Sequence, residues 1–295
     1  MIERGIKKQI ESRLFKGKAI ILYGARQVGK TTLMKEIAAQ YGEEGVWLNC
    51  DEPEPQILLS NVSSTKYKEI LGKKRILFID EAQRVKNIGI ALKIFVDNFP
   101  DKQVIATGSS SFDLANDITE PLTGRTYNFQ LFPFSMSELQ QLYQQPFELE
   151  RVLESRLIFG TYPDVVLRSE EAEELLGSIA TAYLFKDIFA WQNVKNPDML
   201  LNLLRALALQ VGNEVSFSEL AKLVGITKET VMSYINLLEK TFVIFRLQPL
   251  ARNLRNEIGT SLKIYFFDNG IRNALIANLN PLELRQHVVA RCLPG

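Results

Sequence analysis

The strongest constraint on the fold is a glycine-rich motif near the amino terminus. Its spacing is G-x-x-x-x-G-K-T, and its residues are Gly24, Ala25, Arg26, Gln27, Val28, Gly29, Lys30, Thr31 and Thr32. An apolar run over residues 19–23 precedes the motif, and a helix-forming segment over residues 33–39 follows it. A strand, a glycine loop and a helix in this order are typical of a P-loop, in which backbone N–H groups and the start of a helix surround phosphate.

The side chains of this motif indicate which ligand it binds. Lys30 is expected to reach the β- and γ-phosphates of a nucleoside triphosphate, and the Thr31 hydroxyl is expected to bind Mg²⁺. All the motif residues are therefore candidates for nucleotide binding, and ATP and Mg²⁺ are the expected cofactors.

A second motif indicates what happens to the nucleotide. Four consecutive apolar residues, 76–79, are followed by Asp80 and Glu81. A continuous apolar run favours a strand that is buried on both faces. In such a Walker B motif Asp80 would order the metal ion, and Glu81 would polarise the water that attacks the γ-phosphate. The pair therefore predicts an ATPase rather than a nucleotide sensor that cannot hydrolyse.

Polar residues end two further apolar runs. Asn49 ends one run, and Thr107 and Ser109 end another. In a parallel sheet these ends meet at the edge that binds ligands. Asn49 could orient the attacking water or form an Asx-turn. Thr107 and Ser109 could bond the γ-phosphate as a sensor, or form a turn that caps a helix over residues 112–114.

Arg125 is the last candidate of the predicted ATPase core, at the start of a strand over residues 126–131. An arginine can stabilise the charge of a transferring phosphoryl group, from its own subunit or from a neighbour in a homo-oligomer. Alternatively, Arg125 is a surface residue that pairs with an acid such as Glu120.

Composition excludes several other classes of protein. The chain of 295 residues has 35 Lys and Arg against 34 Asp and Glu, which is too balanced for a wholly basic nucleic-acid-binding protein. With one histidine, His287, a histidine-based zinc site or catalytic triad is excluded. No apolar run approaches the roughly 20 residues of a membrane span, and the amino terminus lacks the apolar stretch of a signal peptide. We therefore expect a cytoplasmic protein without membrane contacts.

The carboxyl-terminal half contains a predicted winged helix-turn-helix. A capped helix over residues 216–225 ends in glycine, a second helix follows over residues 226–240, and two strand-like runs come next. Residues 205–275 hold nine basic and six acidic side chains, a modest excess for a phosphate-binding surface. Duplex DNA binding is one hypothesis, and a wing that packs on the ATPase core is the other. Basic residues concentrate near the wing, at Arg246, Arg252 and Arg255.

The order of these motifs resembles one family, the prokaryotic AAA-domain ATPases of the archaeal-ATPase and STAND-like branch. The resemblance runs from about residue 15 to about residue 285. Besides the P-loop and Walker B, the segments that carry it are residues 106–110, 124–125, 133–135, 159–165 (Phe-Gly-Thr-Tyr-Pro-Asp-Val) and 263–272 (Lys-Ile-Tyr-Phe-Phe-Asp-Asn-Gly-Ile-Arg).

The resemblance implies an α/β fold with an AAA+-like parallel-sheet core, a helical lid and a winged helix. We assign the core to residues 1–135, the lid to 136–205 and the winged helix to 206–275. In related switch ATPases a glycine-x-proline segment of the lid contacts adenine. Here the segment is one residue longer, from Gly160 to Pro163, and Pro163 is the candidate adenine contact; alternatively, the two residues only punctuate helices.

Members of this family usually continue into a nuclease-like domain of about a hundred residues, the size of a small domain. Residues 276–295 are therefore expected to be a stub or altered start of that missing domain, and nuclease activity is not carried over. The resulting hypothesis is a slow ATPase that works as a conformational switch. The alternatives are a DNA-binding protein regulated by ATP and a nucleotide-gated scaffold for a protein partner.

Overall fold

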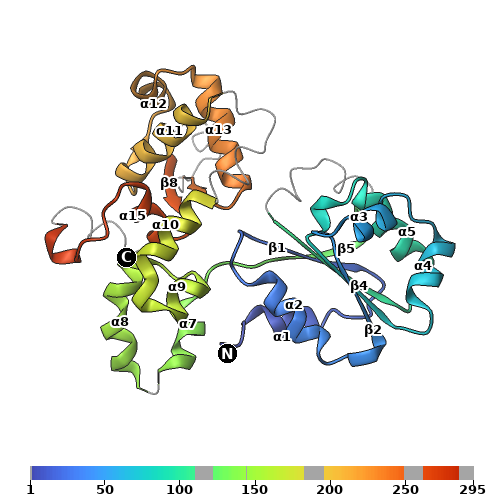
Figure 1. Ribbon diagram of the computed structural model, residues 1–295. Helices are drawn as coiled ribbons and strands as arrows, with labels where there is room; N and C mark the ends of the chain where they lie inside the picture. The colour runs from blue at the N-terminus through green and yellow to red at the C-terminus, as the bar shows by residue number, and fades with distance from the viewer. Residues whose placement is uncertain (1, 110–121, 144, 183–195, 249–261, 286–295) are drawn as a thin grey trace, which may run out of the picture. The chain divides into compact units, whose positions relative to one another are not determined.

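The computed structural model describes residues 2–109, 122–143, 145–182, 196–248 and 262–285. The chain divides into two compact units, Met1–Phe132 and Pro133–Gly295, and each is described by itself (Figure 1). The division into core, lid, winged helix and stub stays a prediction. The expected helix over residues 112–114, Glu120, Arg252, Arg255 and the tail from residue 286 lie outside the described residues.

A parallel sheet forms the centre of the first unit. Its strand order is β2-β3-β4-β1-β5, and every neighbouring pair is parallel. The predicted α/β fold with a parallel-sheet core is therefore confirmed. The strands are β1 (Ala19–Tyr23), β2 (Gly45–Asn49), β3 (Ile76–Asp80), β4 (Gln103–Gly108) and β5 (Thr126–Gln130).

The burial of the strands follows their sequences. Every residue of β3 and β4 is buried, whereas β2, at the edge of the sheet, is only half-buried. Such complete burial is expected of central parallel strands, which are covered on both faces. The carboxyl ends of β3 and β4 are thus fixed by the core beneath them.

Helices cover the sheet, and Figure 1 shows α3, α4 and α5 gathered on one side of it. On that side Leu59, Tyr67 and Phe95 pack with Ile21 and Leu77 of the sheet. The rings of Tyr67 and Phe95 meet edge-on at 5.3 Å. The helices of this unit are α1 (Ile6–Glu11), α2 (Lys30–Ala38), α3 (Pro53–Ser60), α4 (Ser64–Leu71) and α5 (Ile88–Asn98), with short 3-10 turns η1 (Gly42–Glu44) and η2 (Ala82–Arg84).

The first part of the second unit is helical. Its elements are α7 (Met136–Leu139), η3 (Gln140–Leu142), α8 (Pro146–Phe159), α9 (Pro163–Leu167), η4 (Ser169–Glu171), α10 (Ala172–Ala182) and α11 (Pro197–Leu209). Proline occupies the first turn of α8, α9 and α11, where its missing N–H costs nothing. Across the described parts of both units, no helix combines the length and apolar character needed to span a bilayer.

A helix–turn–helix and a small antiparallel sheet follow. The Ser216 side chain caps α12 (Phe217–Val224), and Gly225 ends it in the left-handed conformation, with a φ of 77°. Thr227 then caps α13 (Lys228–Lys240) by accepting a hydrogen bond from the Thr230 N–H at 3.2 Å. The sheet has the order β6-β8-β7, with β6 (Glu214–Val215), β7 (Ile244–Leu247) and β8 (Leu262–Phe266); α15 (Asn269–Leu275) and η6 (Leu282–Leu284) come last.

A single buried carboxylate joins two distant segments of this unit. Asp268 caps α15 by accepting from the Ile271 N–H at 3.1 Å, and it also accepts from the Thr161 N–H at 2.8 Å. A Cβ atom at Gly160 would lie 2.1 Å from the Asp268 Oδ1, and the φ of Gly160 is 74°. Only glycine fits there without displacing the carboxylate. The Gly-Thr-Tyr-Pro and Phe-Asp-Asn-Gly-Ile-Arg segments are therefore two halves of one structural element.

Candidate active site

The P-loop connects the carboxyl end of β1 to α2, and its shape depends on glycine at two positions. Gly24 has a φ of 154°, and a Cβ atom there would lie 2.1 Å from the Leu131 carbonyl oxygen. Gly29 has a φ of 95° and forms the N-cap of α2. Position 24 therefore requires glycine because a side chain would clash with the Leu131 backbone. Position 29 requires glycine because its φ lies in the left-handed region.

Lys30 lies inside this loop, and only 5% of its surface is exposed. Its ammonium group donates to the carbonyl oxygens of Gly24 at 2.8 Å and Ala25 at 2.7 Å. The positive charge is therefore held at the loop, together with the backbone N–H groups at the start of α2. This combination of charge and N–H donors fits a polyphosphate.

Thr31 and Asp80 meet across the first turn of α2. The Thr31 hydroxyl donates to Asp80 Oδ1 at 3.1 Å. A hydroxyl and a carboxylate are hard oxygen ligands, the type that Mg²⁺ prefers when phosphates and waters complete its shell. Within the described residues, no cluster of three or more His, Cys, Asp or Glu could hold a metal by itself. The pair therefore fits Mg²⁺ bound together with a nucleotide.

Thr107 connects the two acids of the Walker B motif. Its hydroxyl donates to Asp80 Oδ1 and accepts from the Glu81 N–H at 3.1 Å. Asp80 thus receives hydroxyl groups from both Thr31 and Thr107. The end of β4 is in this way attached to the end of β3 at the residues where hydrolysis is predicted.

Glu81 adopts an unusual backbone conformation. Its φ of 53° and ψ of 42° lie in the left-handed region, which residues other than glycine rarely adopt. Its side chain accepts a hydrogen bond from the Gln83 Nε2, and the Ser109 N–H donates to Gln83 Oε1 at 3.3 Å. Gln83 was not among the residues predicted for the site, and the one sequence signal for it is its place two residues after Glu81.

Asn49 ends the strand next to β3. Asn49 pairs in register with Asp80, and its side-chain oxygen accepts from the Asp51 N–H at 3.2 Å. This contact is the Asx-turn that was the alternative for Asn49. Its role towards water stays a prediction.

Arg125 lies where the strands of the sheet begin, whereas the P-loop lies where β1 ends. Arg125 precedes β5, and its carbonyl oxygen accepts from the N–H of Ala19, where β1 begins. At about 3.3 Å per residue, the length of β1 puts the P-loop roughly 16 Å away. The Arg125 side chain pairs instead with Asp97 at 2.7 Å, and this hydrogen bond holds the pKa of Asp97 below its ordinary value. The structure does not bring Arg125 to the P-loop of its own unit, and action from a neighbouring subunit stays a prediction.

Pro163 begins α9 in the second unit, so its predicted contact with adenine stays a prediction. Its position is determined by the Asp268 element, because Thr161 is bonded to that carboxylate. Burial raises the pKa of Asp268, although the N–H groups of Thr161, Ile271 and Gly270 oppose this shift.

Arg4 is a second residue that the sequence analysis missed. Its guanidinium is buried and donates to the carbonyl of Val28, in the P-loop, at 3.3 Å. It also donates to the carbonyl of Phe132, where the first unit ends. A charged donor on two backbone carbonyls stabilises the outer side of the P-loop.

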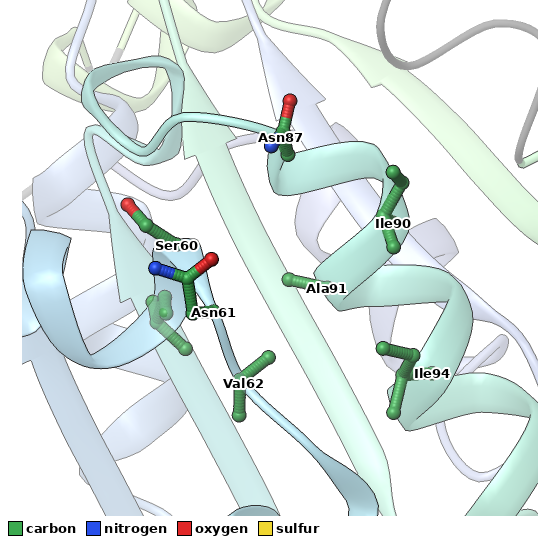
Figure 2. A pocket seen from close by; sticks show the side chains of 8 residues that line it. Ser60, Asn61, Val62, Asn87, Ile90, Ala91 and Ile94 are labelled. Atoms are coloured by element: carbon green, nitrogen blue, oxygen red, sulfur yellow. The ribbon is translucent and has the colours of Figure 1, made fainter.

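Two further features of the first unit carry no nucleotide chemistry. Burial, reinforced by Asp80, Asp51 and Glu81, raises the pKa of Cys50 to about 12, so its thiol stays neutral. A cavity of about 330 Å³ lies between the end of α3 and α5, and Figure 2 shows the side chains that line it. Its wall combines Ile90 and Ile94 with uncharged polar groups such as Asn61 and Asn87, so it offers no charge to a phosphate.

The surface of α13 bears on the DNA hypothesis. The helix buries Val231, Ile235 and Leu238 and exposes Lys228 among its polar residues. Of the basic residues near the predicted wing, Arg246 forms an ion pair with Glu239 of α13. Its charge is thus partly neutralised within the unit.

The fold and this site define the first unit as a P-loop NTPase fold. Comparison with known families agrees, because residues 16–140 match the AAA domain family and residues 150–283 match a domain of unknown function (DUF8612). The AAA domain that the sequence motifs predicted is thus confirmed for residues 16–140.

Its relatives come from archaea and bacteria. An uncharacterized protein of Methanocaldococcus jannaschii is 24% identical over 95% of this chain and 69% of its own length. An uncharacterized protein of Haemophilus influenzae is 21% identical over 87% of this chain and 68% of its own length. The chain thus spans about two thirds of these relatives. Among solved structures, the ORC1 protein of Aeropyrum pernix in complex with DNA is 12% identical with a TM-score of 0.37, covering 97% of this chain and 94% of its own. That likeness is too weak to support a conclusion.

Proposed function

We propose that this protein is a Mg²⁺-dependent ATPase that hydrolyses ATP to ADP and phosphate as a slow conformational switch. One observation carries the proposal: Asp80 Oδ1 accepts the hydroxyl groups of both Thr31 and Thr107, directly beside Glu81. The residues proposed as metal ligand, sensor and base are thus joined by hydrogen bonds, which supports these roles.

Each residue has a distinct role in this proposal. Lys30 and the loop N–H groups bind the phosphates, and Thr31 and Asp80 hold Mg²⁺. When bound, Mg²⁺ supplies positive charge that stabilises the phosphate oxygens. Glu81 accepts a proton from the attacking water. Thr107 and Ser109 are the candidate sensors of the γ-phosphate, and Asn49 is the candidate that orients the water.

The second unit is proposed to respond to the state of the nucleotide. Its first helices would form a lid, with Pro163 at the adenine, and α12, α13 and the small sheet would form a winged helix. Arg125 is proposed to act in a homo-oligomer, across a subunit boundary. If it does, specific activity will rise with protein concentration in wild type, and less so in Arg125→Ala.

The ATPase proposal is tested by Glu81→Gln. This variant should bind ATP with an affinity close to that of wild type while turnover falls by about two to four orders of magnitude, the range for loss of a general base. ATP affinity is measured by fluorescence with a labelled nucleotide, and turnover by phosphate release with and without Mg²⁺. Unchanged turnover in the variant would sink the proposed mechanism.

A second candidate function is DNA binding regulated by ATP. The favouring observation is the capped helix–turn–helix of α12 and α13, followed by an antiparallel sheet. Because Arg246 forms an ion pair with Glu239, we expect its contact with a DNA phosphate to be weak. Fluorescence anisotropy of a labelled duplex, titrated at several salt concentrations with and without ATP, tests this function. Binding that does not depend on salt, or no binding at low salt, would contradict the DNA-binding function. The nucleotide-gated scaffold for a protein partner would then be the remaining alternative.

A further inference from the structure

Gln83 occupies a special place between the catalytic carboxylate and the neighbouring strand. It lies in η2, two residues after Glu81, and its amide contacts both Glu81 and Ser109. The Ser109 N–H can donate only to the amide oxygen, and this contact of 3.3 Å fixes the orientation of the amide group. The Nε2 therefore faces Glu81 Oε2 and donates to it.

The backbone of Glu81 is attached to the same strand by a separate bond. Its N–H donates to the Thr107 hydroxyl at 3.1 Å. The backbone of Glu81 is thus connected to Thr107 of β4, and its carboxylate is connected through Gln83 to Ser109, the residue that follows β4. A left-handed backbone is strained for a residue with a Cβ atom, and these contacts stabilise Glu81 in that conformation.

We infer that Gln83 is a positioning residue for Glu81, an inference that rests on the proposed ATPase function. By binding Oε2, Gln83 fixes the plane of the carboxylate. Oε1, which has no hydrogen-bond donor in the described part of the chain, remains the oxygen that accepts the proton from water. The same amide ties the base to Ser109, so that a displacement of the end of β4 also displaces Glu81.

A positioning role for Gln83 predicts kinetic effects that differ from those of a residue that only stabilises the η2 turn. Misplacement of a catalytic group by about 1 Å can cost on the order of a hundredfold in rate without changing substrate binding. A residue that acts only through Glu81 loses its influence once the carboxylate is gone, because the two effects are then not additive.

The test combines Gln83→Met, which keeps the size of the side chain and removes both hydrogen bonds, with Glu81→Gln. In the wild-type background, Gln83→Met should lower kcat by about 10- to 100-fold while KM for ATP changes by less than about threefold. In the Glu81→Gln background it should cause no further loss of kcat. The matched control is Gln56→Met. The Gln56 amide donates a hydrogen bond to the Cys50 carbonyl, just after β2, at 2.8 Å and does not contact Glu81. That control should retain wild-type kcat.

Two results would overturn the inference: wild-type kcat in Gln83→Met, or the same fold-loss in both backgrounds. If Gln83→Met does not fold, Gln83→Glu replaces it. This variant keeps the oxygen that accepts from Ser109 and loses the donor to Glu81, and it should also lower kcat with little change in KM. Failure of the inference is distinct from failure of the ATPase proposal. In the first case wild type hydrolyses ATP, and Gln83→Met either keeps wild-type kcat or loses the same factor in both backgrounds. In the second case wild type itself releases no phosphate.

Discussion

The two units each contain a buried aspartate at the end of a strand, and the difference between them is instructive. Asp80 and Asp268 are equally buried, with 6% of their surface exposed. Asp80 accepts from the hydroxyl groups of Thr31 and Thr107, whereas Asp268 accepts from the backbone N–H groups of Thr161 and Ile271. A hydroxyl can rotate towards a metal ion or a phosphate, but a backbone N–H cannot leave without local unfolding. We therefore interpret Asp80 as a group for chemistry and Asp268 as a group for architecture.

The largest expected effect on stability is that of Asp268→Ala. The substitution removes a helix cap and leaves buried N–H groups without an acceptor, which together should cost the second unit about 3–5 kcal/mol. Urea unfolding followed by far-UV circular dichroism measures this loss. The corresponding variant in the first unit, Asp80→Ala, should cost less than Asp268→Ala, because the hydroxyl partners of Asp80 can rotate to other acceptors. A loss for Asp80→Ala as large as that for Asp268→Ala would contradict this difference.

Gly160→Ala should have the next largest effect. Its Cβ atom would lie 2.1 Å from Asp268 Oδ1 at a φ of 74°, so strain and overpacking should cost about 2–4 kcal/mol. Combined with Asp268→Ala, most of the steric part should disappear, and a double-mutant cycle in urea would then show strong coupling. Additive losses would mean that the glycine is required for its backbone conformation alone.

Arg4→Gln should have a smaller effect, in the first unit. Arg4 is comparable to Asp268, because it bonds backbone groups of two distant segments, the carbonyls of Val28 and Phe132. Its loss should destabilise the unit by about 1–3 kcal/mol. Because the Val28 contact lies in the P-loop, we also expect weaker ATP binding, by about tenfold.

Trp47 fluorescence in a Trp191→Phe background reports this unfolding, and a nucleotide titration reports the affinity. The control is Lys8→Gln, since Lys8 is exposed and its closest acid, Glu3, lies 3.7 Å away. Equal behaviour of the two variants would show that Arg4 does not support the P-loop.

The smallest expected effect is a dependence on pH. Burial raises the pKa of Asp268 above the unfolded value of 3.8, against the opposing N–H groups and Arg156. The pH-dependent part of the stability that this group contributes is therefore fully present below pH 3.8 and is lost as the pH rises through its folded pKa. The urea midpoint of wild type relative to Asp268→Asn should fall over that interval. Asp97→Asn should give the opposite sign, because the hydrogen bond from Arg125 lowers the pKa of Asp97, and its contribution is lost as the pH falls.

The sequence predicted the parts of the site that depend on local pattern. The glycine spacing identified Gly24 and Gly29, and the apolar run before Asp80 identified a strand buried on both faces. These features follow from neighbouring residues alone. The partners of Arg4, Gln83 and Asp268 lie 128, 26 and 107 residues away, so no local pattern could reveal them.

Arg125 illustrates a different kind of difficulty. The sequence suggested the strand over residues 126–131 and put Arg125 at its mouth, next to the nucleotide. Because β5 runs parallel to β1, its first residues lie where β1 starts, and the P-loop lies where β1 ends. The direction of a strand in the sheet, which periodicity does not encode, decides which edge a flanking residue reaches.

We propose that the end of β3 carries the chemistry and that the Asp268 element carries the architecture. The most direct test is the steady-state ATP turnover of two matched acid-to-amide variants, Asp80→Asn and Asp268→Asn, each shown to be folded. We predict that Asp80→Asn lowers turnover by about 100-fold or more, the typical cost of removing a group that stabilises the transition state. Asp268→Asn, which keeps one acceptor oxygen, should stay within about tenfold of wild type. A fully active Asp80→Asn, or a greater loss in Asp268→Asn, would contradict the account.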